Sequence, residues 1–350
     1  MARLLTAGFE TGTIMEMNGP SNTAIAAPEV STTARTGTYS LKLGAYGSGL
    51  TGAYKGHVFG DDLTELWFRF AFQYDANVAG DFPLLKFYDD LGAIQIILAY
   101  DISTQSLQWQ NGAGTMIAAG HLTLQPSTWY MIEGHLTIGG SGVATCKVNA
   151  VTDASFSGDT DYTNAGNVRA LRFTGPPISG GFMCYCYIDD IGVNDGTDSF
   201  QNSYPGLGGI FFLKANGDGV TTDWTTSEIS DHYALVDEVP ANTTDWVQGE
   251  NAGDLELFDI ENTPTYVVAI NVVQPVFQAA VAVSGSNELQ DVVYDGASEY
   301  PGSTTHTIIS IHPTYVLYRG ETYYEQPDGV SGAFDEDALD ALQVGFQIPV

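Results

Sequence analysis

Apolar and polar residues alternate with a period of two along several segments of this chain. In segment 66–74 one set of alternate positions is apolar: Leu66, Phe68, Phe70, Phe72 and Tyr74. The positions between them hold Trp67, Arg69, Ala71 and Gln73, and segments 94–100 and 130–138 repeat the pattern. Successive side chains of a strand point to opposite faces, so each segment can bury one face and leave the other partly polar. This alternation is typical of an antiparallel β-sandwich.

The composition also indicates an all-β protein with more than one domain. The chain has 350 residues, of which 40 are Gly and 12% are aromatic, and good helix formers seldom follow one another. Such a chain favours many short strands and is long enough for two domains, each with its own core. Turn-forming residues dominate from Asp195 to Gly209. We therefore predict a first β-sandwich domain over residues 1–196, a linker over 197–209 and a second β-sandwich domain over 210–350.

The second domain is expected to contain one short helix near its end. Asp335 can cap this helix, and the acidic first turn suits the positive end of the helix dipole. Ala338, Leu339 and Leu342 give it an apolar stripe, and residues 344–348 return to a strand. Other strands are expected at residues 210–213, 233–236, 266–273, 276–283, 307–311 and 315–318.

The charge balance limits the partners that the protein can have. Eleven Lys and Arg face 42 Asp and Glu, which gives a net charge of −31. Contacts to phosphate groups need clustered Lys and Arg, so we expect no nucleic-acid partner and no membrane partner.

The apolar run at the N-terminus is too short for a signal peptide, and the three cysteines are an odd number for a disulfide framework. We therefore expect synthesis and folding in a cytoplasm.

Two adjacent carboxylates, Asp189 and Asp190, follow the apolar part of segment 184–195. Neighbouring strand residues point to opposite faces, so we expect these two side chains on different faces. A carboxylate turned toward protein needs a cation, an arginine or backbone amides as its partner. The residues themselves leave these three alternatives open.

Four short motifs occur in the order typical of a known fold: residues 8–12 (GFETG), 37–43 (GTYSLKL), 129–133 (WYMIE) and 187–191 (YIDDI). Residues 5–196 thereby resemble concanavalin A-like (laminin-G or lectin-type) jelly-roll domains. The resemblance implies that the first and last strands lie side by side and share a structural calcium ion. Its ligands would be Glu10 with Asp189 or Asp190, since calcium prefers oxygen ligands. The second half is similar to the C-terminal portion of tailed-bacteriophage virion proteins that carry a lectin-like domain.

The polar faces of the predicted strands suggest a carbohydrate-binding surface. If the strands are neighbours, one sheet face carries Trp67, Arg69, Gln73, Gln108, Glu133 and His135. An aromatic ring beside planar hydrogen-bonding groups suits the apolar face and hydroxyl rim of a sugar. In the alternative interpretation, this face packs against the second domain or another subunit, with Arg69 and Glu133 as an ordinary ion pair.

The sequence gives little sign of catalysis. Some glucanases with this jelly roll carry two glutamates flanking an aspartate at alternate positions, but in segment 256–261 Leu257 replaces the first glutamate. We therefore expect a non-enzymatic virion structural protein of a tailed phage. It would be displayed on the capsid or tail surface as a decoration, cement or appendage subunit, bound to other virion proteins and to itself as a homo-oligomer. The alternative is a lectin-like adhesion protein that recognises surface glycans of a host or matrix.

Overall fold

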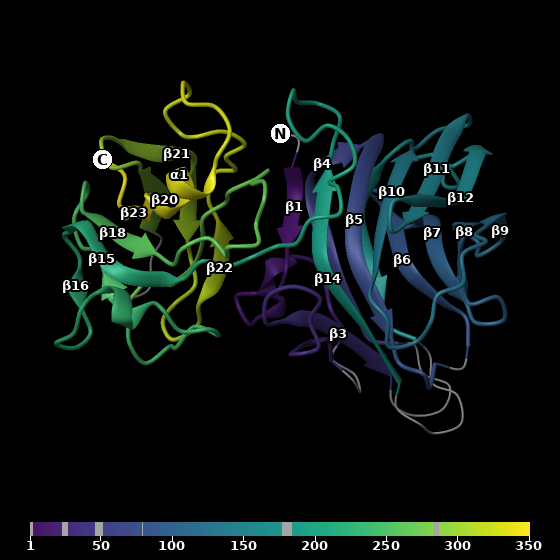
Figure 1. Cartoon of the computed structure of the whole chain (residues 1–350), viewed down its shortest axis with the longest axis horizontal. Coiled ribbons are helices and arrows are strands. Elements are labelled where there is room, and N and C mark those ends of the chain that lie inside the picture. Colours follow the sequence, from purple (N-terminus) through teal and green to yellow (C-terminus); the bar gives the residue numbers. More distant parts are fainter. Residues whose placement is uncertain (1–2, 23–26, 46–51, 79, 177–183, 283–286) are drawn as a thin grey trace. The chain divides into compact units, whose positions relative to one another are not determined.

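The structure is a computed structural model that describes residues 3–22, 27–45, 52–78, 80–176, 184–282 and 287–350 (Figure 1). The chain divides into two compact units, unit 1 over Met1–Phe211 and unit 2 over Phe212–Val350. Residues 197–209, expected to be a linker, therefore fall within unit 1. Among the described residues, no helix combines the length and the apolar character needed to cross a membrane.

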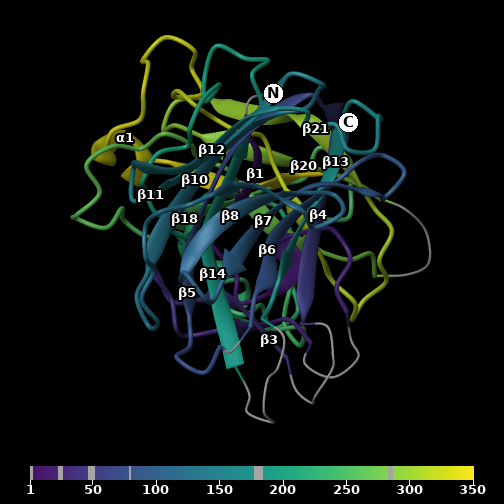
Figure 2. The same cartoon turned by 90° about the vertical axis from the view of Figure 1, so that its right-hand side faces the viewer.

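Unit 1 consists of two antiparallel sheets. Sheet A has the strand order β12-β11-β10-β5-β14-β3-β2, with β1 also paired to β14, and sheet B has the order β4-β13-β6-β7-β8-β9. The strands of sheet A are β1 (Arg3–Ala7), β2 (Glu29–Ser31), β3 (Ser40–Ala45), β5 (Glu65–Tyr74), β10 (Tyr130–Thr137), β11 (Gly142–Val148), β12 (Val151–Gly158) and β14 (Cys184–Asn194). Those of sheet B are β4 (Tyr54–Leu63), β6 (Phe82–Tyr88), β7 (Ile94–Asp101), β8 (Ser106–Asn111), β9 (Met116–Ala119) and β13 (Val168–Thr174). Figure 2 shows β6, β7 and β8 side by side.

The core of unit 1 lies between the two sheets and is built by the alternation seen in the sequence. Phe68 of β5 lies 5.4 Å from Phe87 of β6 between ring centroids, and Phe70 lies 5.0 Å from Phe173 of β13. All four rings are buried. Burying apolar side chains of this size stabilises a fold by about 1.5–3 kcal/mol each. The prediction of an all-β sandwich is confirmed, and each sheet keeps an outer face directed away from this core.

The first and last strands of unit 1 lie side by side, as the sequence motifs implied. The pairing runs from Arg3 opposite Asn194 to Ala7 opposite Ile191. The paired strand is thus β1, whereas the motif at residues 8–12 lies just beyond it.

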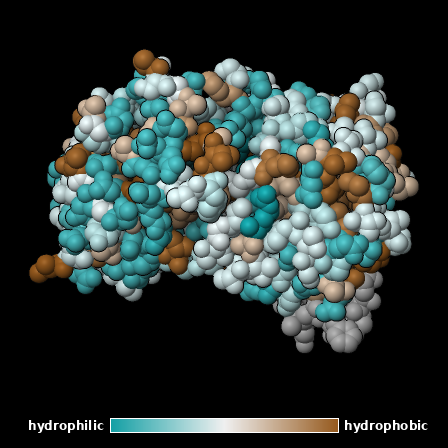
Figure 3. Space-filling view, in the orientation of Figure 1, coloured by the Kyte–Doolittle hydropathy of each residue, from teal (hydrophilic) through white to brown (hydrophobic). Residues whose placement is uncertain are grey.

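Unit 2 is also built from antiparallel strands. Its five-stranded sheet has the order β15-β18-β23-β20-β21, with β15 (Ala215–Thr222), β18 (Leu255–Ile260), β23 (Gln343–Gln347), β20 (Asn287–Tyr294) and β21 (Glu299–Ile308). Two short pairs join β16 (Thr225–Thr226) to β17 (Val247–Gln248) and β19 (Val276–Ala279) to β22 (Val316–Arg319). Hydrophilic residues cover much of the visible surface of this unit (Figure 3).

The predicted helix is present as α1 (Glu336–Asp340). Asp335 caps it by accepting a hydrogen bond from the Ala338 amide at 2.8 Å, and Leu339 and Leu342 are buried. Several strands predicted for the second domain are not formed. Residues 233–235 form a 3-10 turn, and residues 210–213 and 266–272 lie outside strands. The segment expected at 276–283 forms β19 in its first half, and its last residue lies outside the described residues.

Candidate functional site

Most of the residues predicted to bind a sugar do share one face. Glu133 and His135 of β10 stand directly opposite Arg69 and Trp67 of β5, and Gln73 follows on the same outer face of sheet A. Gln108 does not join them, because it lies on β8 in sheet B. Alternation therefore predicted which face each residue occupies, but it could not predict which strands are neighbours.

The chain itself covers the charged part of this face. The Gly206 amide donates to Glu133 Oε1 at 3.1 Å, and Arg69 Nη1 donates to the Gly206 carbonyl at 3.1 Å. Arg69 is only 5% exposed and Glu133 only 4% exposed. Neither of the two earlier interpretations foresaw this cover by the segment expected to be a linker. Sugar binding at this face stays a prediction, and a ligand there would reach Arg69 and Glu133 only by displacing Gly206.

Trp67 and His135 remain partly accessible on that face. Their rings are stacked, with centroids 4.7 Å apart and planes 4° apart, and His135 Nε2 lies 2.7 Å from Glu65 Oε1. The broad face of Trp67 that a sugar would use therefore already carries an imidazole on one side.

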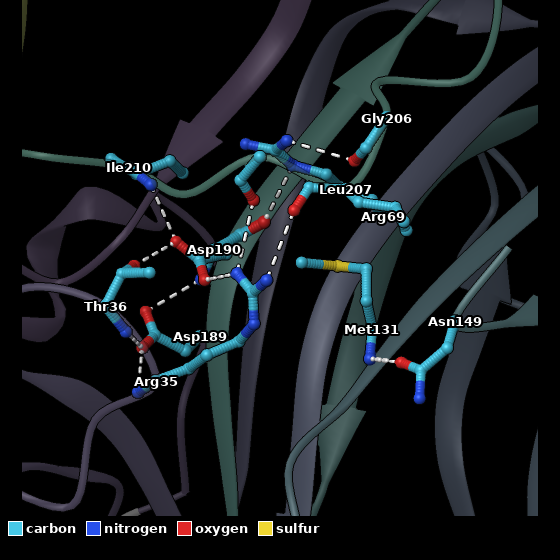
Figure 4. A network of polar contacts seen from close by, with 11 residues as sticks. Arg35, Thr36, Arg69, Met131, Asn149, Asp189, Asp190, Gly206, Leu207 and Ile210 are labelled. Atoms are coloured by element: carbon cyan, nitrogen blue, oxygen red, sulfur yellow. Dashed lines mark hydrogen bonds and ion pairs between the residues drawn. The ribbon is translucent and has the colours of Figure 1, made fainter. Parts of the chain in front are cut away.

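Asp189 and Asp190 are fully buried and lie on the same side of their strand (Figure 4). Asp190 has a φ of 53°, and the pairing of β14 with β5 shifts between Asp189 and Gly192. Such a bulge interrupts the alternation of side chains, so the expectation that the two carboxylates occupy different faces is wrong. Both now face Arg35: Asp189 Oδ2 accepts from its amide at 2.8 Å, and Asp190 Oδ2 pairs with its Nη1 at 2.7 Å.

The same network holds the end of unit 1. Asp190 Oδ1 accepts from the Thr36 hydroxyl at 2.6 Å and from the Ile210 amide at 2.7 Å. Arg35 also donates to the carbonyls of Leu207 and Gly208. Of the three partners left open by the sequence, the structure thus supplies an arginine and backbone amides. Through Arg35 and the Ile210 amide, the paired aspartates hold residues 207–210 against β14.

Glu10, the third predicted calcium ligand, is held by backbone donors. Its two oxygens accept from the amides of Thr38 and Tyr39 at 2.8 and 2.9 Å, and burial raises the pKa of this carboxyl to about 7. In the described part of the chain, no group of three or more His, Cys, Asp and Glu side chains is placed to hold a metal ion. A calcium ion here stays a prediction that the hydrogen bonding of these oxygens does not require.

A different surface, the outer face of sheet B, contains an unusual pair of cations. Arg172 lies between the core residues Leu171 and Phe173 of β13, so its side chain points outward. Lys86 stands directly opposite it on β6. Like charges in this position repel each other and destabilise a sheet.

Two tyrosines flank the arginine. The guanidinium carbon of Arg172 lies 4.3 Å from the ring centroid of Tyr54 and 4.5 Å from that of Tyr88. These cation–π contacts hold the side chain in place and leave its five N–H donors without a carboxylate. Such a guanidinium is positioned to bind an anion.

No carboxylate of the protein neutralises this pair. The described residues include all 42 Asp and Glu, and none forms an ion pair with Lys86 or Arg172. Burial, reinforced by the neighbouring Arg172, lowers the pKa of Lys86. Burial raises the pKa of Tyr88, although Arg172 opposes this effect. In a chain of net charge −31, this is a local site of the opposite sign.

The pair belongs to a row of residues that crosses the sheet. Lys86 is opposite Ile97 of β7, and Ile97 is opposite Gln110 of β8. We call this row, with its two tyrosines, the cationic strip; it comprises Tyr54, Arg172, Tyr88, Lys86, Ile97 and Gln110. Five strands at about 4.8 Å spacing, from β4 to β8, give it a length of about 19 Å. Its charged residues, Tyr54 and Gln110 are partly exposed, whereas Ile97 and Tyr88 are buried.

Sequence reasoning missed the strip, although it contains a usable signal. Lys86 and Arg172 each interrupt an apolar stretch, Leu-Leu-Lys-Phe and Ala-Leu-Arg-Phe, within a chain poor in basic residues. A basic residue inside a strand-like segment must point outward from the core. The sequence could not show that β6 and β13 place these two charges, which are 86 positions apart, in register.

No protein-family model matches the sequence, and no curated protein matches it. Several solved structures are similar in fold. The endo-β-1,4-glucuronan lyase of the fungus Trichoderma reesei is 14% identical, with 48% of this chain and 86% of that chain covered and a TM-score of 0.39. The cellulose-induced protein Cip1 is 15% identical, with coverages of 54% and 96% and a TM-score of 0.43. The alginate lyase vAL-1 from Chlorella virus is 12% identical, with coverages of 48% and 89% and a TM-score of 0.33.

These similarities correct the functional expectations drawn from the sequence. The structures named are polysaccharide lyases and a cellulose-induced protein rather than bacteriophage capsid or tail proteins. The predictions of a non-enzymatic virion structural protein, a capsid decoration and a tail appendage are therefore wrong.

Proposed function

We propose that the protein is a carbohydrate-active enzyme that binds an acidic polysaccharide along the cationic strip and cleaves it by β-elimination. The observation that carries this proposal is the pair Arg172 and Lys86, which stand in register without a carboxylate partner. A bound anion would relieve their mutual repulsion and replace the hydration that each cation loses on burial.

A uronate residue fits the strip better than an isolated anion does. Its planar carboxylate matches the fork of a guanidinium, which binds carboxylates through two parallel hydrogen bonds. The partly exposed ring of Tyr54 offers a flat surface to a sugar, and Gln110 offers an amide to its hydroxyl groups. The remaining acidic surface does not prevent such binding, since the Debye length at physiological salt is about 8 Å.

The directions of the pKa shifts favour an acid and a base within the strip. Arg172 would neutralise the uronate carboxylate, which makes the proton on the adjacent ring carbon more acidic. Lys86, whose lowered pKa favours its neutral amine form, would in that neutral form take the proton as the general base, while Arg172 alone holds the carboxylate. The bond to the glycosidic oxygen then breaks, its electron pair leaves with the oxygen, and a carbon–carbon double bond forms. Tyr88, whose pKa is raised, would protonate the departing oxygen.

Incubation with a panel of polyuronides tests the proposal. We expect an unsaturated product, detected by its ultraviolet absorbance, from at least one polyuronide and from none of the matched neutral polysaccharides. Arg172→Ala and Lys86→Ala should each abolish the product, whereas Lys42→Ala, which removes a lysine paired with Glu29 on the other sheet, should not. Binding without an unsaturated product would refute the elimination step. Equal activity of Arg172→Ala and the unchanged protein would refute the assignment of the site.

A further inference from the structure

Next to the cationic strip, one buried glutamine binds the loop of residues 161–167 to the outer face of sheet B through hydrogen bonds. Gln95 of β7 points outward but is 0% exposed. Its amide nitrogen donates to Asp161 Oδ1 at 2.9 Å and to the Asn167 carbonyl at 3.3 Å, and its oxygen accepts from the Thr163 amide at 3.0 Å. Buried hydrogen bonds of this kind stabilise one loop conformation, because each would leave an unsatisfied polar group if broken.

This loop carries an exposed aromatic ring, that of Tyr162. Tyr162 lies between Asp161 and Thr163, two of the three residues that Gln95 binds, and is 48% exposed. Its ring rests above Gly112, where an added Cβ would lie 2.3 Å from Tyr162 Cδ1. The absence of a side chain at Gly112 therefore allows the ring to lie close to the backbone at the end of β8.

The ring is in reach of a ligand that occupies the strip. Gly112 follows the last residue of β8 and lies two residues beyond Gln110. Gln110 lies in the same row as Lys86, two strands across the sheet, with Ile97 between them. Two strand spacings and two residue rises combine to about 12 Å from the backbone of Lys86 to that of Gly112. A short run of linked sugar rings spans such a distance.

We infer that Tyr162 is a second binding subsite, a stacking platform for a sugar ring of the same polysaccharide whose uronate carboxylate binds at Arg172 and Lys86. This inference rests on the proposed function and adds a dependence on chain length. A ligand limited to the cation pair would not touch Tyr162, whereas a longer one would bury one face of a ring against it. The platform itself carries no charge, so it accepts neutral and acidic sugar units alike.

Calorimetric titration of the full-length protein with uronate oligosaccharides of increasing length tests the inference. Tyr162→Ala should weaken the binding of long oligosaccharides by about 3- to 10-fold and leave a disaccharide unaffected. Tyr162→Phe, which keeps the ring, should bind like the unchanged protein. Unchanged thermal unfolding of both variants would show that the loop still folds, as expected for a half-exposed side chain.

The outcomes separate the subsite from the proposed function. A Tyr162→Ala variant that binds all lengths normally, or that loses equal affinity for all lengths, would overturn the platform. Lys86→Ala is titrated in parallel, because this change should weaken the binding of short and long oligosaccharides alike. A normal affinity of Lys86→Ala together with a length-dependent loss in Tyr162→Ala would instead overturn the role of the cation pair and leave the platform standing.

Discussion

Replacing Lys86 by methionine should stabilise unit 1 and weaken ligand binding at the same time. Methionine has a similar length but no charge, so the change removes the repulsion between Lys86 and Arg172 across β6 and β13. The pKa of Lys86 is lowered, which means that its charged form is disfavoured in the folded state. A lysine of this kind contributes stability above its ordinary pKa and loses that contribution as the pH falls. At neutral pH the charge therefore costs free energy, and its removal recovers it.

The two effects can be sized separately. Like charges directly opposite each other in an antiparallel pair destabilise it by about 0.2–1 kcal/mol. For a unit of this size, a gain of 1 kcal/mol raises the melting temperature by about 2–4 °C, so we expect an increase of about 0.4–4 °C. Loss of a charge-assisted hydrogen bond to a uronate carboxylate costs about 1.5–3 kcal/mol, which is a loss of affinity of about 10- to 150-fold.

Thermal unfolding and calorimetric titration with an acidic oligosaccharide measure both effects on one preparation. Lys42→Met is the matched control, because Lys42 Nζ pairs with Glu29 Oε1 at 2.8 Å. This control should lose up to about 1 kcal/mol of stability and keep its affinity. Raising the salt concentration should shrink the stability gain of Lys86→Met, since salt screens the repulsion. A Lys86→Met variant that is less stable than the unchanged protein, or that binds the oligosaccharide equally well, would refute this reasoning.

Three further predictions concern the rest of the chain. Asp190→Asn removes the buried partner of Arg35 and should lower the unfolding free energy of unit 1 by about 3 kcal/mol in a denaturant titration; a loss below 1 kcal/mol would contradict it. The pKa of Glu10 is raised from 4.5 to about 7, so its contribution to stability is complete at low pH and is lost as the pH rises toward 8; thermal unfolding from pH 5 to 8 should show a decline that Glu10→Gln reduces, the remainder coming from Asp189, whose pKa burial raises to about 8. Asp335→Ala removes the cap of α1 and should cost unit 2 about 1 kcal/mol, whereas Asp335→Asn should cost little.

The predictable part of the fold follows from local patterns. Alternation along residues 66–74 and 130–137 assigned the buried faces of β5 and β10, and the cap at Asp335 located α1. These features depend on residues close together in the sequence, where propensity and periodicity act directly. Unit 2 was harder to predict. Its strand β15 reads Ala-Asn-Gly-Asp-Gly-Val-Thr-Thr, in which turn-forming residues outnumber typical strand formers.

Long-range features of the fold could not be predicted from the sequence, for a physical reason. The bulge that brings Asp189 and Asp190 to the same arginine depends on a residue with a positive φ inside a strand. No periodic pattern in the sequence predicts such a residue, because the residue itself interrupts the alternation of side chains. The cover of Glu133 by Gly206 is likewise a contact across 73 positions, made by a segment whose composition indicates only a linker.

The cationic strip shows how a local conflict in a stable fold can indicate function. In sheet A, buried charges such as Asp190 have partners that satisfy them, so their burial is consistent with stability alone. In sheet B, Lys86 and Arg172 oppose each other without a carboxylate, and an apolar residue at either position would stabilise the sheet. Folding alone therefore gives no reason for two cations at these positions. An external anion supplies the missing partner, and the tyrosines that flank Arg172 suit an anion carried on a sugar.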